Sequence, residues 1–266
     1  MPKPLATQLY TFRDTTKPGV EGLGLDPATL AAIAEIGFLG VETVDVPGGD
    51  PVAARRAIEA AGLQVASAHT WTKLDDLEAF DRASAAIAEL GSSSIILSGS
   101  GFDSVEIVDA FADRLNAASE VAGRHGLALG YHNHSAEMRP VDGVPVYRRL
   151  LERVDPAVAF QVDIFWVQVG GLAPGPVITE LGERVVSLHV KDGVTLPSDA
   201  GAEPFVNVPV GQGVIDVAGA VEAAGDLPRI GWLIVEFDHC DGPPLEAVAD
   251  SYAYLVSRGL GRGSVG

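Results

Sequence analysis

Polar side chains that can bind a metal ion or a small substrate follow almost every apolar run that reads as a strand. Each stands at or just after the C-terminal end of its run, and the run itself is apolar. In a closed barrel of parallel strands these ends meet at one mouth, where the active sites of that architecture lie. The residues that share this position are Gln8, Tyr10, Glu42, His69, Ser98, His132, His134, Glu137, Asp163, His189, Lys191, Glu236 and Asp238.

Four of these residues form a candidate metal site. Three carboxylates and one imidazole suit a divalent ion; we expect Mn²⁺ first, with Mg²⁺, Co²⁺ or Zn²⁺ as alternatives. Buried together without a cation, the carboxylates would repel one another and leave charge unpaired. The predicted ligands of this single ion are Glu137, Asp163, His189 and Glu236.

Each ligand taken alone also has a structural interpretation. Asp163 equally fits a helix cap or a partner of a nearby lysine, and His189 fits a hydrogen-bonded core histidine. Glu137 lies past its strand, so its position says little. Glu236 follows a buried Ile-Val pair, where an unpaired carboxylate costs free energy. The prediction of a metal site therefore rests on the four residues occurring together.

The elements that must position these side chains alternate between short β-rich runs and longer alanine-rich stretches. Apolar residues recur at helical spacing in the longer stretches, which cover 27–36, 51–61, 76–90 and 105–125. Eight strands alternating with helices predict a single (β/α)8 TIM barrel over residues 1–258, with a flexible C-terminal tail at 259–266. The expected strands are 5–9, 40–43, 64–68, 94–97, 127–131, 157–162, 185–190 and 232–237.

Composition excludes several classes of function. The chain has 266 residues, 47% of them hydrophobic, and a formal net charge of −18. Such a charge repels nucleic acid and anionic membranes. Cys240 is the only cysteine, so neither an intrachain disulfide nor a thiolate zinc site can form. With no secretion signal and no apolar run long enough to span a membrane, we expect a cytoplasmic protein, and a homo-oligomer is compatible with the sequence.

The run YHNHSAE at 131–137 resembles a signature of the xylose-isomerase-like barrel superfamily, in its branch of sugar phosphate isomerases and epimerases. The resemblance implies a TIM barrel with Glu137, Asp163, His189 and Glu236 as metal ligands. Narrower isomerases of the superfamily carry the fifth-strand carboxylate at the strand end, so His134 could replace or supplement Glu137. Further segments that resemble this branch are QLYTFRD at 8–14, GFLGVE at 37–42, DIFW at 163–166, HVKD at 189–192, GQG at 211–213 and VEFD at 235–238.

The function we expect is isomerisation or epimerisation of a ketose or keto-sugar. A divalent ion would acidify the carbon between carbonyl and hydroxyl and stabilise the resulting enediolate. Glu137 and Glu236 would move the proton, with His134 or His69 serving on one side as an alternative. The remaining substrate contacts are expected from His69, His132, Trp166, Lys191 and Asp192, with Trp166 as an apolar wall.

Three other functions stay open at this point. The same enediolate in a lyase or dehydratase would expel a neighbouring substituent from a keto-sugar or cyclitol. An abasic-site endonuclease needs more ligands and is disfavoured by the charge of −18. A non-catalytic sugar-binding barrel would not need a metal ion flanked by bases. We expect a neutral or oxidised sugar rather than a phosphorylated one, because Lys191 is the only cation among the strand ends.

Overall fold

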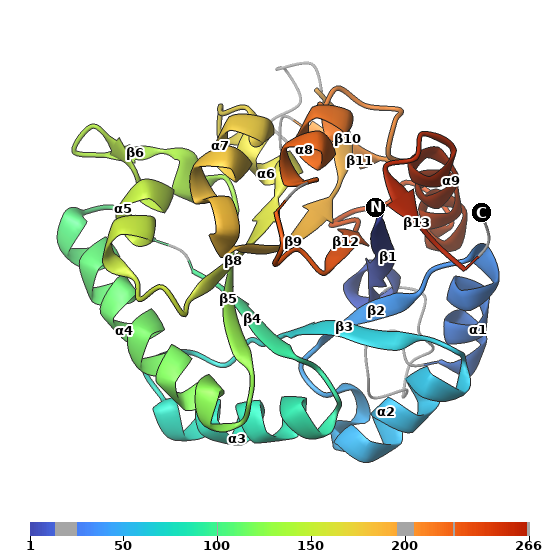
Figure 1. The fold of residues 1–266 in the computed structure, drawn as a ribbon, viewed down its shortest axis with the longest axis horizontal. Coiled ribbons are helices and arrows are strands. Elements are labelled where there is room, and N and C mark those ends of the chain that lie inside the picture. Colours follow the sequence, from blue (N-terminus) through green and yellow to red (C-terminus); the bar gives the residue numbers. More distant parts are fainter. Residues whose placement is uncertain (14–25, 100, 196–204, 226, 265–266) are drawn as a thin grey trace.

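The computed structural model describes residues 1–13, 26–99, 101–195, 205–225 and 227–264. Eight parallel strands close into a barrel, because the last of them, β12, pairs with β1 through Leu5–Leu233 and Thr7–Val235. The predicted (β/α)8 barrel is therefore confirmed (Figure 1). In barrel order the strands are β1 (Lys3–Gln8), β2 (Gly40–Val44), β3 (Gln64–His69), β4 (Ser94–Ser98), β5 (Ala128–His132), β8 (Ala159–Asp163), β9 (Val185–Val190) and β12 (Trp232–Val235).

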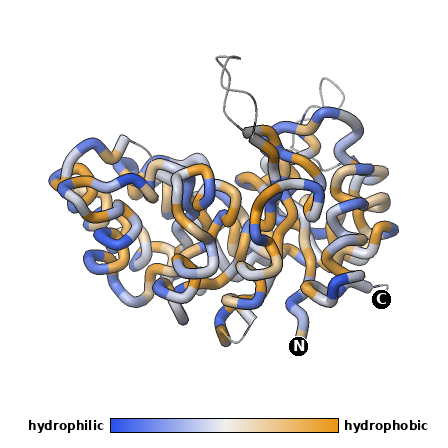
Figure 2. Tube along the Cα trace, turned by 90° about the horizontal axis from the view of Figure 1, so that it is seen from above, coloured by the Kyte–Doolittle hydropathy of each residue, from blue (hydrophilic) through white to orange (hydrophobic). Residues whose placement is uncertain are grey.

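Helices surround the barrel and pack their apolar faces on the strands. Figure 2 shows hydrophobic and hydrophilic residues alternating along the helical turns, as amphipathic helices on a sheet require. The helices are α1 (Pro27–Ile36), α2 (Pro51–Ala60), α3 (Leu77–Glu89), α4 (Val105–Arg124), α5 (Val146–Arg153), α6 (Ile164–Val169), α7 (Pro174–Leu181), α8 (Val217–Ala224) and α9 (Pro244–Ser257).

Local sequence explains where several helices begin and end. Asp26 caps α1 by accepting from Thr29 N, and Asp50 caps α2 by accepting from Val52 N and Ala53 N; proline follows each cap. Gly37 ends α1 with a φ of 117°, and a Cβ there would lie 2.3 Å from the Tyr252 hydroxyl. Both the backbone angle and the close approach of α9 therefore require glycine.

The barrel interior changes from apolar to polar along its axis. Ala6, Ala66 and Ile234 form a small buried cluster against Trp232 inside the barrel. Two residues further along the same strands lie Gln8 and Glu236, and both are buried. The apolar cluster therefore fills one level of the barrel, and polar side chains fill the level nearer the C-terminal mouth.

Two regions differ from the sequence-based expectation. No strand was expected between 190 and 232, but the hairpin strands β10 (Asp192–Thr195) and β11 (Phe205–Val208) lie there; 196–204 lie outside the described residues. Within the expected tail, β13 (Gly261–Arg262) pairs with Lys3–Pro4 of β1. β13 pairs with the first two residues of β1, which precede the residues of β1 that pair with β2 and β12. Sequence periodicity does not reveal where unpaired backbone groups of a strand find such a partner.

Smaller elements connect the main ones. They are η1 (Leu9–Phe12), η2 (Pro47–Gly49), η3 (Ala136–Met138), η4 (Gly182–Arg184), and the paired strands β6 (Pro140–Val141) and β7 (Val144–Pro145). No helix in the described part of the chain is long and apolar enough to cross a membrane.

Candidate functional site

Three of the four predicted metal ligands converge at the C-terminal ends of neighbouring strands β8, β9 and β12. One ligand atom each from Asp163, His189 and Glu236 lie within 4.8 Å of one another. His189 Nδ1 is 2.8 Å from Glu236 Oε2 and 4.0 Å from Asp163 Oδ2. All three side chains are buried. Strand order explains this convergence, since β9 lies between β8 and β12 in the sheet.

Lys191 extends the same group with a positive charge. Its Nζ lies 2.6 Å from Glu236 Oε2, 3.0 Å from Asp163 Oδ2 and 2.8 Å from Asp238 Oδ2. The side chain is 1% exposed, so its charge is held almost entirely out of water. The ammonium group therefore forms ion pairs with two of the candidate ligands, and only the Asp238 end of this cluster reaches solvent, with that side chain 34% exposed.

The donor set fits a divalent cation. Asp163 Oδ2 is buried and has no hydrogen-bond donor among the described residues, although Lys191 Nζ forms an ion pair with it. A buried acceptor without a hydrogen bond carries an unfavourable desolvation free energy, which a bound cation would offset. Two carboxylates and one imidazole are also a donor set that Mn²⁺, Co²⁺ and Zn²⁺ accept. We therefore regard Asp163, His189 and Glu236 as the residues able to hold the ion.

Glu42 at the end of β2 is the centre of a second buried network beneath these residues. Its Oε1 accepts from Gln8 Nε2 at 2.6 Å and lies 2.7 Å from His189 Nε2. Its Oε2 accepts from Gln161 Nε2 at 2.7 Å and from the Ser67 hydroxyl. Every acceptor position of this carboxylate is used, so Glu42 fixes the orientation of the His189 ring rather than facing a substrate.

His69 and His132 belong to that network. His69 Nε2 and His132 Nδ1 lie 2.7 and 2.8 Å from Gln161 Oε1. Together with His189 they form a second group of ligand atoms within 4.8 Å of one another. Both residues are buried. The structure thus places them below the mouth, where they support the site, and their expected contact with substrate stays a prediction.

Burial and neighbouring charges act in opposite directions on the pKa of His189 and on that of Glu42. Burial disfavours the charged forms of both, but the Glu42 and Glu236 carboxylates raise the pKa of His189 to about 10. In the same way, His69 and His189 outweigh burial and lower the pKa of Glu42 to about 2. His189 is therefore an imidazolium between two carboxylates at neutral pH. A metal ion would take the place of the Nδ1 proton, since ligation needs the neutral ring.

The neighbouring carboxyl groups are affected in different directions. Burial raises the pKa of Asp163 to about 6, and the charges of Lys191 and His189 oppose this only in part. For Glu236 the same two charges outweigh burial and lower the pKa below its usual range. Burial alone would neutralise Lys191, but Asp163, Asp238 and Glu236 raise the pKa of its ammonium group. Lys191 consequently stays charged.

Glu137 does not join the three convergent ligands. It lies on η3, and its carboxylate accepts from the Tyr131 hydroxyl and, at 3.0 Å, from His134 N. Neither group of candidate ligands in the described residues contains it. Its expected role as the fourth ligand is therefore not supported by this arrangement. Because Glu137 lies past the end of β5, its carboxylate stabilises the turn at His134 by accepting from that backbone amide. Burial raises the pKa of the Glu137 carboxyl group.

His134 lies at the open side of the site and its ring accepts or donates no hydrogen bond among the described residues. The ring centroid is 5.7 Å from that of Trp166 and 5.1 Å from that of His132. Trp166 Nε1 is buried without a partner in the described part of the chain. Burial and the charge of Lys191 lower the pKa of His134 from its ordinary value of about 6.5 to about 4. It is a neutral base at physiological pH.

Asp192 has a different role from the expected one. Its Oδ1 accepts from Gly193 N and Ile215 N, and its Oδ2 accepts from Gly211 N and Gly213 N, all at 2.8–3.0 Å. A carboxylate has about four acceptor positions, so none remains for a substrate hydroxyl. Asp192 thus organises the loop after β9, which corrects its assignment as a substrate ligand.

Gln161 is the residue that the sequence-based interpretation missed. It is fully buried in β8 and links His69, His132 and Glu42. A signal was present, because Gln161 is the one polar residue before Asp163 in an otherwise apolar strand and stands two positions earlier on the same face. The role of Glu42 was also missed, although its place at a strand end was recognised.

Comparisons with solved structures agree with the fold. A sugar phosphate isomerase/epimerase from Parabacteroides distasonis ATCC 8503 has a TM-score of 0.80 at 21% identity, covering 98% of this chain and all of that one. An L-ribulose 3-epimerase has a TM-score of 0.73 at 15% identity, covering 98% and 95%. A xylose isomerase-like TIM barrel protein from Mycobacterium smegmatis, in complex with magnesium, has a TM-score of 0.68 at 16% identity, covering 96% of each chain.

No curated protein sequence matches this chain. The family model for the xylose isomerase-like TIM barrel matches residues 30–258. That range contains seven of the eight barrel strands and every candidate ligand described above. The chain belongs to the xylose isomerase-like TIM barrel family.

Proposed function

We propose that the protein is an enzyme that isomerises or epimerises a ketose or keto-sugar at one divalent metal ion, with Mn²⁺ as the first candidate. The observation that carries this proposal is the convergence of Asp163, His189 and Glu236 around a buried Asp163 oxygen that accepts no hydrogen bond from the described residues. Bound there, the ion would supply Lewis acidity to a substrate carbonyl and the adjacent hydroxyl.

We assign proton transfer to two residues, His134 and Glu236, at separate places on the barrel mouth. His134 follows β5, and Glu236 follows β12, which is separated from β5 by β8 and β9 in the sheet. A substrate lying between them meets one base from each side, as an epimerisation requires. The neutral His134 ring takes the proton from carbon, and Glu236, held by Lys191 and His189, is the second candidate.

Two further groups suit the polar part of a sugar. Trp166 Nε1 has a buried N–H without an acceptor among the described residues, so a substrate oxygen beside His134 would satisfy it. Lys191 donates to Asp238 at 2.8 Å, at the more exposed end of its cluster. A substrate hydroxyl bound next to Asp238 would share that ammonium group.

Deuterium uptake tests the proposed function. Protein freed of metal with a chelator and then reloaded with Mn²⁺ is incubated in D₂O with a panel of ketoses and keto-glycosides. We expect deuterium at the carbon next to the carbonyl, and no uptake by the metal-free protein or by Asp163→Asn. The variant Arg56→Gln, with its exposed side chain on α2, is the matched control.

The products separate the alternatives. Deuterium uptake with an unchanged carbon skeleton and no leaving group indicates isomerisation or epimerisation, whereas uptake accompanied by an expelled substituent indicates a lyase. A protein that binds sugars but catalyses no exchange with any divalent ion contradicts the proposal and favours a non-catalytic barrel.

A further inference from the structure

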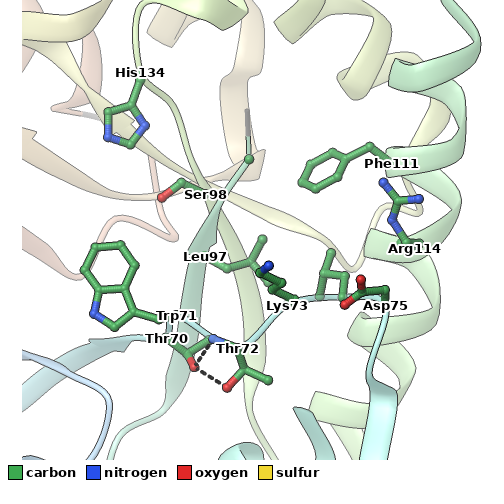
Figure 3. A pocket seen from close by; sticks show the side chains of 12 residues that line it. Thr70, Trp71, Thr72, Lys73, Asp75, Leu97, Ser98, Phe111, Arg114 and His134 are labelled. Carbon is green, nitrogen blue, oxygen red and sulfur yellow. Dashed lines mark hydrogen bonds between the residues drawn. The ribbon is translucent and has the colours of Figure 1, made fainter. Parts of the chain in front are cut away.

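A cavity of about 540 Å³ opens beside the candidate site, on the side of β3 and β4. His134 and Trp71 lie on one side of it and Arg114 of α4 on the other, with Lys73 of the loop after β3 between the two sides (Figure 3). This volume is in the range of small-molecule sites, about 300–1,000 Å³. His134 lines this cavity and also borders the site proposed for the reaction, so the two are adjacent.

The loop after β3 holds Trp71 in place at the cavity. Asp45, a non-glycine residue with a φ of 48°, accepts from the Thr70 hydroxyl at 2.7 Å and from Trp71 N at 3.3 Å. The Thr70 hydroxyl also accepts from Thr72 N at 3.1 Å. Strained backbone of this kind persists where surrounding contacts fix it, often at functional sites. These contacts fix the backbone on both sides of Trp71.

Trp71 itself remains largely in solvent. Its side chain is 62% exposed, whereas Trp166 and Trp232 are half-buried. Its only ring contact among the described residues is an edge contact with Tyr10, at 6.3 Å between centroids. A large aromatic face that is held by its backbone and left open at a cavity is suited to bind the apolar face of a ligand ring.

Two cations face the same cavity without a carboxylate partner in the described part of the chain. The Lys73 side chain makes neither an ion pair nor a hydrogen bond there, and the Arg114 guanidinium makes only a contact with the Phe111 ring, 5.7 Å from its centroid. The chain has a net charge of −18, so a cavity lined by two cations contrasts with its overall charge. Asp75 is the one acidic residue in the cavity lining. The local charge is therefore positive in a strongly acidic protein.

We propose that this cavity is a subsite for the distal part of the substrate, and that it takes a sugar bearing an anionic group, either a phosphate or a carboxylate. The proposal rests on the proposed function for the reacting end of the substrate. Trp71 would stack on the sugar ring, and Lys73 and Arg114 would bind the anion by charge-assisted hydrogen bonds. The expectation from the strand ends was a neutral or oxidised sugar. The proposal keeps an oxidised sugar that carries a carboxylate and adds a phosphorylated one, because Lys73 and Arg114 come from a loop and a helix and not from strand ends.

Equilibrium binding tests the subsite without requiring catalysis. Tryptophan fluorescence is titrated with glucose 6-phosphate, glucuronate, glucose and inorganic phosphate, in metal-free and Mn²⁺-loaded protein. We expect one or both anionic sugars to bind at least tenfold more tightly than glucose, with affinity falling as ionic strength rises. The anion that loses more affinity in the variant Lys73→Gln/Arg114→Gln identifies the natural group as phosphate or carboxylate.

Matched variants show whether the cavity is responsible. Lys73→Gln/Arg114→Gln should weaken the anionic sugar by about tenfold per cation, the lower end for a charge-assisted hydrogen bond, and change glucose by less than about twofold. The control Arg56→Gln/Arg124→Gln removes the same charge from residues outside the cavity lining and should leave all affinities within about twofold. Trp71→Ala should weaken the sugars but leave inorganic phosphate unchanged.

Two results overturn the subsite. One is the absence of a preference for anions: glucose binds as tightly as both anionic sugars, or no anion binds at concentrations of about 10 mM, where even a very weak site would be occupied. The other is equal loss of affinity in the cavity variant and in its charge-matched control. If anion preference holds while no substrate exchanges deuterium, the proposed reaction fails and the subsite stands. If exchange occurs without anion preference, the proposed reaction stands and the subsite fails.

Discussion

Replacing Lys191 by methionine should tighten the binding of a divalent ion. In the structure the ammonium nitrogen lies 2.6 Å from Glu236 Oε2 and 3.0 Å from Asp163 Oδ2, so it holds two oxygens that the ion needs. Methionine has a similar length and no charge. The variant therefore leaves the carboxylates in place and removes the cation that competes for them.

The size of the effect follows from Coulomb's law with a discount. Two unit charges about 4 Å apart interact by about 4 kcal/mol at an effective dielectric constant of 20, and a divalent ion doubles this. Lys191 can turn toward Asp238, whose side chain is 34% exposed, and so relieves part of the repulsion. We expect about 1.5–3 kcal/mol to remain, which corresponds to metal affinity higher by about 10- to 100-fold.

Isothermal titration calorimetry of chelator-treated protein with Mn²⁺ measures this directly. Lys73→Met removes the same charge at an exposed position outside the ligand group and should leave the metal affinity within about twofold. The metal-free Lys191→Met protein should also be less stable, because buried carboxylates lose their partner at a cost of about 3–5 kcal/mol. Unchanged or weaker Mn²⁺ binding would refute the idea that the ammonium and the ion compete for Asp163 and Glu236.

Four other variants test separate parts of the site. His134→Ala should slow turnover by about 10²- to 10⁴-fold with metal content unchanged, and loss of the metal in elemental analysis would make the ring a ligand instead. Glu236→Gln should keep the fold by circular dichroism but lose most activity, and near wild-type turnover would exclude Glu236 as a base. Asp192→Ala should lower the melting temperature, because four backbone amides lose their acceptor. The loss in the free energy of unfolding should be about 1–3 kcal/mol in total, and an unchanged melting temperature would contradict this role. Glu42 has a pKa lowered from 4.5 to about 2, so its contribution to the stability of the metal-free protein is present above pH 4.5 and is lost as pH falls to 2. Glu42→Gln should therefore show a shallower fall of melting temperature between those pH values, and an identical profile would count against the ionised carboxylate.

The barrel and the position of its mouth could be predicted because they depend on periodicity. Apolar runs with a polar residue at the same end report strand direction, and Asp163, His189 and Glu236 were placed by that rule alone. Asp192 shows where the rule fails. It follows a strand end like the others, but its partners are amides between 193 and 215, whose approach depends on loop geometry. Glu137 fails for a related reason, since the turn after β5 directs its carboxylate to Tyr131.

Gln161 shows a different limit. Its position on the inward face of β8 can be read from alternation, but its four partners come from β2, β3, β5 and β9. Which of these strands lie close enough depends on the register of the closed barrel, including the bulge between Val41 and Glu42. Local sequence carries little information about such a register.

The pairing of β1 with β12 has a consequence for how the protein folds. Thr7 Oγ1 donates to Val235 O at 2.9 Å across a sequence separation of 228 residues, and the Leu5–Leu233 register lies beside it. Contacts so distant along the chain form late and slow the rate of folding. Glu236 and Glu42 reach His189 from strands on opposite sides of this seam, so the His189 ring is held by both carboxylates only once the seam has closed. Metal added during refolding should therefore bind the oriented His189 ring after the rate-limiting step. It should leave the refolding rate unchanged and slow unfolding.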